Sequence, residues 1–198
     1  MALHVVGLGG TYRPHSTTEL ALRIALGAAA ELGAEVEVFG AAALELPMYR
    51  PASAEGELAP GARTLIEAVR SADALIVASP GYHGGISGLV KNALDYLEEL
   101  RGDARPYLDG RAVGCIATAA GWQAATTTLA ALRQVAHALR GWPTPLGASI
   151  NTLETQFTPD GGCSSPQVTA QLRTIGEQVV QFAQLAQLAQ LARRGQPA

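Results

Sequence analysis

This 198-residue sequence has few cysteines and aromatic residues, a small net charge and only short apolar runs. Its two cysteines, Cys115 and Cys163, belong to no CxxC pair and no cysteine–histidine cluster, so neither a zinc motif nor a redox pair is indicated. A net charge of −3 gives no electrostatic attraction to nucleic acid or to an anionic membrane. Because no run reaches about 18 apolar residues, no segment is expected to cross a membrane.

The remaining composition is typical of one folded domain. Hydrophobic residues make up 48% of the chain and charged residues 16%, which argues against disorder. The length suits a single domain with a sizeable core. The opening residues, MALHVVGLGG, lack the basic and apolar regions of a signal peptide. We therefore expect one domain over residues 1–198, located in the cytoplasm.

Short apolar runs alternate with helical patterns along the chain. The apolar runs cover residues 3–8, 35–39, 74–78, 112–117 and 145–150. The helical patterns cover residues 19–32, 62–70, 88–100, 124–139 and 167–194. This alternation predicts an α/β, flavodoxin-like three-layer sandwich whose five-stranded parallel sheet has the order 2-1-3-4-5. Ligands of such folds bind beyond the carboxyl ends of the strands, so the predicted site lies in loops 9–18, 79–87 and 119–123.

The C-terminal sequence AQLAQLAQLARR repeats every three residues, whereas a helix repeats every 3.6. Its leucines therefore drift around the helix and form no single stripe. We predict a helical tail at about residues 183–198 that extends beyond the core. It is either a frayed end or an oligomer contact, and the sequence leaves both alternatives open.

The first predicted loop follows a buried strand and is rich in glycine and hydroxyl groups. It lacks the lysine of a P-loop, and Tyr12 stands where a dinucleotide fingerprint needs its third glycine. A plain turn would need one capping hydroxyl, but this loop has four and an arginine. Together with the start of a helix, these groups favour phosphate binding. The candidate phosphate ligands are Thr11, Arg13, Ser16, Thr17 and Thr18.

The second loop carries a more specific motif. Residues 79–95 read SPGYHGGISGLVKNALD and resemble a Pro-x-Tyr-Asn/His-Gly stretch, followed by Lys-Asn-Ala-x-Asp, of the NADPH-dependent FMN reductase family. The first loop is similar to the same family's Gly-Ser/Thr-x-Arg-x-x-Ser pattern. The residues that match this pattern are Gly10, Thr11, Arg13 and Ser16.

This resemblance implies that the five candidate ligands bind the phosphate of FMN and that the second and third loops line its ring. The second-loop residues are Pro80, Gly81, Tyr82, His83, Gly84 and Gly85. The third-loop residues are Ala119, Ala120, Gly121 and Trp122, and the bulky Trp122 could shape the pocket. We expect Lys91, Asn92 and Asp95 to be structural. The flavin would carry the chemistry, so no catalytic side chain and no metal ligand are predicted.

The resemblance further implies an NAD(P)H-dependent flavin reductase. Hydride would pass from NADPH or NADH to FMN, and then to a small-molecule acceptor or a partner monooxygenase. The alternatives are a quinone or azo reductase, a non-enzymatic electron carrier and a flavin-free interaction protein; carriers are usually more acidic than this chain. A homodimer or homotetramer is also implied, for which Leu89-Val90 and residues 94–97 offer apolar surface unless they pack on the sheet.

Overall fold

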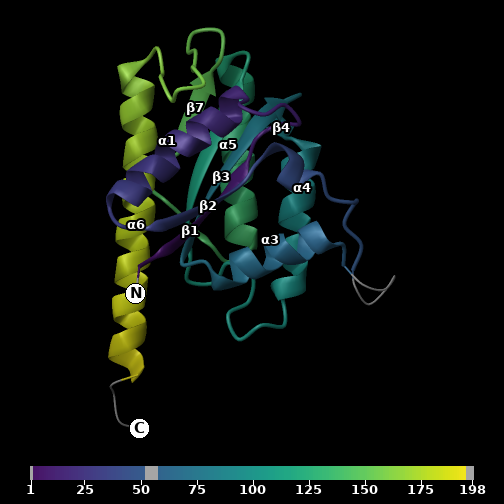
Figure 1. Cartoon of the computed structure of the whole chain (residues 1–198), viewed down its shortest axis with the longest axis vertical. Coiled ribbons are helices and arrows are strands. Elements are labelled where there is room, and N and C mark those ends of the chain that lie inside the picture. Colours follow the sequence, from purple (N-terminus) through teal and green to yellow (C-terminus); the bar gives the residue numbers. More distant parts are fainter. Residues whose placement is uncertain (1, 52–57, 195–198) are drawn as a thin grey trace.

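The computed structural model describes residues 2–51 and 58–194, which form a sheet between two layers of helices (Figure 1). Helices α1 (Thr17–Glu31) and α6 (Pro166–Arg194) cover one face. The other face is covered by α3 (Pro60–Ser71), α4 (Gly88–Asp95) and α5 (Trp122–Ala138). Each face has its own apolar cluster, so the sheet is buried on both sides.

The parallel sheet has the predicted order. Its central strands are β1 (His4–Gly9), β3 (Ala74–Tyr82) and β5 (Ala112–Ala119), and β2 (Glu35–Phe39) forms one edge. Two short strands, β6 (Trp142–Pro143) and β7 (Ala148–Asn151), both pair with β5. Counted together as the fifth strand of the sheet, they give the order 2-1-3-4-5, which confirms the prediction.

The fifth strand differs from the single run predicted at 145–150. The backbone N–H groups of Trp142 and Thr144 donate to the carbonyls of Arg111 and Val113, but that of Leu146 donates to Gln178 Oε1 at 3.1 Å, which interrupts the ladder between β6 and β7. Within the gap, the Thr144 hydroxyl donates to the carbonyl oxygen of Leu146 at 2.8 Å, and Arg133 donates to the carbonyl of Thr144 at 2.7 Å. Side chains thus replace the missing strand hydrogen bonds.

The second predicted loop is largely a hairpin. Strand β3 continues to Tyr82 and turns at His83 and Gly84, and the chain returns as the antiparallel strand β4 (Gly85–Ile86). Both turn residues have positive φ, 53° and 80°, which matches the twist of two-residue hairpins. The prediction of a loop at 79–87 was wrong because the proline and glycines of this segment, which are typical of loops, here belong to a short antiparallel strand pair and its turn.

The apolar stretch proposed as an oligomer contact is mostly core. Val90, Leu94 and Leu97 are buried in the cluster beneath α4 and the 3-10 turn Tyr96–Leu100 that follows it, whereas Leu89 is partly exposed. The alternative reading, in which these residues pack on the sheet, is therefore correct for the three buried side chains.

Helix α6 stays in contact with the core as far as Ala183, where the tail was predicted to begin. The Gln187 side chain still donates to Asp73 at 3.2 Å, while Leu185 and Leu188 are exposed. Residues 195–198 of the predicted tail lie outside the described part of the chain. Across the described residues, we find no helix of the length and hydrophobicity needed to span a membrane.

Candidate functional site

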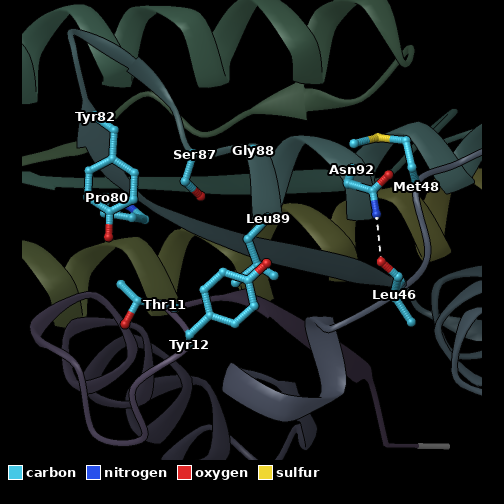
Figure 2. Close-up of a pocket in the computed structure, with 11 residues that line it drawn as sticks. Thr11, Tyr12, Leu46, Met48, Pro80, Tyr82, Ser87, Gly88, Leu89 and Asn92 are labelled. Atoms are coloured by element: carbon cyan, nitrogen blue, oxygen red, sulfur yellow. Dashed lines mark hydrogen bonds between the residues drawn. The ribbon is translucent and has the colours of Figure 1, made fainter.

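A cavity of about 390 Å³ lies at the carboxyl edge of the sheet (Figure 2). The first loop, the β3–β4 hairpin, the start of α4 and the segment after β2 form its walls. Pro80 and Tyr82 lie at one end, and Leu46, Met48 and Asn92 at the other. The lining residues are Gly10, Thr11, Tyr12, Leu46, Met48, Pro80, Tyr82, Ser87, Gly88, Leu89 and Asn92. None of them is a carboxylate, histidine, lysine or arginine.

The first loop ends at the N-terminus of α1. Ser16 caps this helix, and its hydroxyl accepts a hydrogen bond from the backbone N–H of Glu19 at 3.3 Å. The backbone N–H groups of Ser16, Thr17 and Thr18 have no acceptor among the described residues. Unpaired N–H groups at the positive end of a helix form an anion site.

The five candidate phosphate ligands fall into two groups. Thr11 and Thr17 are partly exposed and Arg13 is exposed, and the Thr11 hydroxyl accepts from the Arg13 backbone N–H at 3.1 Å. The Ser16 and Thr18 hydroxyls are buried and already have partners. Thr18 shares a 2.6 Å hydrogen bond with Thr118 at the end of β5, a residue that sequence reasoning missed.

The hairpin residues lie on two sides of the site. Pro80 and Tyr82 face the first cavity, whereas His83 and Gly84 line a second one of about 680 Å³ together with the third loop. A Cβ atom at Gly81 would lie 2.7 Å from the Thr128 hydroxyl oxygen, so only glycine fits where the hairpin crosses α5. The Gly85 carbonyl accepts from the same hydroxyl at 3.4 Å.

The third loop is fixed by a contact that the sequence did not reveal. Trp122 begins α5 and is 51% exposed, and its indole N–H donates to Glu154 Oε1 at 2.9 Å. The same oxygen accepts a 2.6 Å hydrogen bond from the buried Asn151 at the end of β7. Trp122, Ala120 and Gly121 all line the second cavity, whereas Ala119 is the buried last residue of β5.

The wall formed by Leu46 and Met48 was also missed. Asn92 of α4 holds it: its amide donates to the carbonyls of Leu46 and Pro47 at 3.3 and 2.9 Å and accepts from the Tyr49 N–H at 2.8 Å. Figure 2 shows one of these bonds. The sequence offered one signal, because Leu-Pro-Met-Tyr follows a parallel strand at the edge where ligands bind.

Tyr49 itself is a packing residue. Its ring meets that of Tyr96 edge-on at 5.1 Å, and its hydroxyl donates to Glu99 at 2.9 Å. Burial, and then the carboxylate of Glu99, raises the pKa of Tyr49 well above its usual value, so the phenol stays protonated. The exposed Lys91–Asp95 pair, 2.5 Å apart, is the predicted contact along α4.

No cluster of three or more potential metal ligands occurs within residues 2–51 and 58–194. The candidate site consists of the N-terminus of α1 and two cavities lined by the loops that follow β1 and β3 and by the third loop. This combination suits a ligand with a phosphate at one end and a flat ring at the other.

Comparisons with known proteins identify the family of the chain. Residues 3–153 match the family model described as NADPH-dependent FMN reductase. An FMN-dependent NADPH-azoreductase of Staphylococcus aureus is 28% identical over 128 residues, which cover 64% of each chain.

Two solved structures share the fold. The flavoenzyme NAD(P)H:(acceptor) oxidoreductase FerB of Paracoccus denitrificans superposes with a TM-score of 0.74 at 20% identity, covering 93% of this chain and 99% of its own. A flavodoxin of Streptococcus pneumoniae TIGR4 gives 0.59 at 14% identity, covering 89% and 98%. The family match covers every described strand and both sequence motifs, and the chain belongs to the NADPH-dependent FMN reductase family.

Proposed function

We propose that this protein is an NAD(P)H-dependent oxidoreductase that binds FMN and passes hydride from NADPH or NADH to a small acceptor. The observation that carries this proposal is that the N–H groups of residues 16–18 find no acceptor in the described part of the chain, at the end of a loop that also lines an apolar cavity. This pairing fits a phosphate and a flat ring on one ligand. The family match supports the same cofactor.

When bound, FMN supplies the centre that accepts and donates hydride. In the proposal, Thr11, Arg13 and the helix N-terminus bind the phosphate. The hairpin residues form one wall of the ring site, and the third loop offers backbone N–H groups to the ring. The proposal assigns no acid, base or nucleophile role to the described side chains.

For the acceptor we propose a flat, mostly apolar molecule such as a quinone or azo compound. It would bind at the apolar end of the first cavity formed by Leu46 and Met48, opposite the hairpin residues Pro80 and Tyr82 beside which the ring is proposed to lie. The similar Staphylococcus aureus protein is named an azoreductase. Transfer of reduced flavin to a partner monooxygenase is the alternative. Assembly as a homodimer or homotetramer stays a prediction.

Anaerobic stopped-flow spectroscopy tests the proposal. FMN-loaded protein is mixed with NADPH or NADH, and loss of the oxidised flavin absorption band is followed in time. We expect rapid bleaching with at least one nucleotide, and the ratio of the two rates gives the nucleotide preference. Protein that demonstrably holds FMN but stays oxidised with both would contradict the reductase reading and favour an electron carrier.

A further inference from the structure

A buried carboxylate lies against the proposed phosphate loop. Glu19, in the first turn of α1, is 4% exposed. Its Oε1 accepts hydrogen bonds from Arg23 Nε at 2.9 Å and Nη2 at 2.7 Å, and its Oε2 accepts from the backbone N–H of His15 at 3.2 Å. A negative charge beside an anion site repels the anion and weakens its binding, unless the carboxylate also stabilises the structure of the site.

Ser16 and Glu19 form a modified capping box, in which one of the two usual hydrogen bonds is shifted by one residue. In a capping box the N-cap serine accepts from the N–H three residues on, and the glutamate there bonds to the serine's own N–H. Ser16 fulfils the first half at 3.3 Å. The carboxylate, however, takes the N–H of His15, one residue earlier, and leaves the N–H of Ser16 available.

The shift therefore enlarges the anion site. A regular capping box would occupy the Ser16 N–H and leave those of Thr17 and Thr18. In this chain all three consecutive groups stay free among the described residues.

The same hydrogen bond restrains the loop. His15 has φ of 55°, a left-handed conformation that is unfavourable for a residue with a Cβ atom. The side chains from Tyr12 to His15 are exposed, so packing contributes little to holding the backbone there. The bond from Glu19 acts directly on the residue that carries this strain.

The negative charge is balanced locally. Both Arg23 donors converge on one carboxylate oxygen, and the positive end of α1 adjoins the same group. Glu19 can thus hold the loop with little repulsion toward an incoming phosphate.

We propose that Glu19 is a positioning residue for the FMN phosphate: it bonds to His15, holds the loop in its left-handed turn and leaves the Ser16–Thr18 N–H groups open. This inference rests on the proposed function, since it concerns the same cofactor.

The test compares FMN with riboflavin, which has the same ring and no phosphate. Affinities are measured by quenching of flavin fluorescence for the wild type, Glu19→Ala, Glu19→Gln and the control Glu31→Gln. The control removes the same charge from the far end of α1, where Glu31 forms an exposed pair with Arg173. Thermal unfolding followed by circular dichroism shows whether each variant is folded.

We expect Glu19→Ala to weaken FMN binding about tenfold, as loss of a charge-assisted cap would, with little change for riboflavin. Glu19→Gln keeps an acceptor for His15 and should stay within about threefold of the wild type. The control should behave as the wild type does.

Three results would overturn the inference. An unchanged ratio of FMN to riboflavin affinity in Glu19→Ala would leave Glu19 a helix cap alone. Tighter FMN binding would show that repulsion dominates, and equal losses in both variants would assign the effect to the charge. A wild-type protein that binds FMN no better than riboflavin would refute the proposed phosphate site itself, which separates that failure from the others.

Discussion

At the scale of single residues, the two cysteines occupy different environments. Cys115 lies in the core on β5, and burial raises the pKa of its thiol from 9.0 to about 12. Cys163 is partly exposed in the segment before α6, where its sulfur lies 3.5 Å from the carbonyl oxygen of Ser165. Thiolates are the reactive form, so the two groups should differ in reactivity.

We predict that Ellman's reagent modifies Cys163 in the folded protein and reaches Cys115 only after denaturation. Cys163→Ser should abolish the fast reaction. Rapid modification of both thiols in the folded state would contradict the prediction.

The same thiol makes stability depend on pH. Because the unfolded chain loses the Cys115 proton first, Cys115 lowers the free energy of unfolding as the pH rises from 9.0 toward about 12.

Trp122 shows what a residue-by-residue reading of the sequence misses. It begins α5, two residues before the predicted start of this helix, and its orientation depends on Glu154 and Asn151, which come from another strand and turn. No local sequence pattern predicts a contact between residues about thirty positions apart. Trp122 and Glu154 come close because the strands that precede them, β5 and β7, pair side by side.

At the scale of elements, α4 and the segment after β2 are joined by one side chain. Asn92 makes three hydrogen bonds to backbone groups of Leu46, Pro47 and Tyr49. The sequence identified Asn92 as structural by resemblance alone, and the structure shows which segment it holds. The cavity wall at Leu46 and Met48 therefore depends on a residue of a different element.

We predict that Asn92→Ala lowers the free energy of unfolding by about 2 kcal/mol, because the Leu46 carbonyl and the Tyr49 N–H, in a partly buried segment, lose their Asn92 partner. The matched control is Lys91→Ala on the same helix, which removes an exposed ion pair and should cost about 0.5 kcal/mol or less. Chemical denaturation measures both values. Equal costs for the two variants would show that the three hydrogen bonds contribute nothing beyond a surface pair.

Hydrophobic periodicity was sufficient to predict the strand order and most of the helices. It failed where side-chain hydrogen bonds or turn geometry decide the element, as in the β3–β4 hairpin and the interrupted strand at 144–147. Helix α1 begins at Thr17, two residues before the predicted start, because the hydroxyl of Ser16 caps it. The predicted phosphate loop lies between β1 and α1 in the structure, and its phosphate binding stays a prediction; the hydrogen bond from His15 to Glu19 could not be predicted from the sequence.

At the scale of the whole molecule, the two ends of the sheet carry different features. The cavities and loops lie at the carboxyl ends of the strands, whereas Arg111 lies just before β5 at the opposite end. Arg111 is 1% exposed and donates to the carbonyls of Arg70, Ala72 and Tyr107 at 2.8 to 2.9 Å. Burial lowers the pKa of its guanidinium to about 10, which leaves it charged at neutral pH.

We predict that Arg111→Met destabilises the fold by about 3 kcal/mol or more, since three carbonyls lose a charged donor. The FMN affinity of the folded fraction should stay that of the wild type, because the site is at the other end of the strands. The control is Arg101→Gln, an exposed arginine paired with Glu98, which should change stability by about 0.5 kcal/mol or less. Denaturation midpoints and flavin titrations test both statements, and a marked loss of FMN affinity in folded Arg111→Met would contradict the second.

The interrupted strand has a consequence for behaviour at high concentration. An uninterrupted edge strand would offer a row of free backbone groups on which another chain could align and start aggregation. Here one edge is broken between β6 and β7, with the Thr144 carbonyl already bonded to Arg133. The other edge, β2, carries the charged residues Glu35 and Glu37. Both borders of the sheet thus discourage strand-to-strand association, so crowding should favour the native chain over fibrous assemblies.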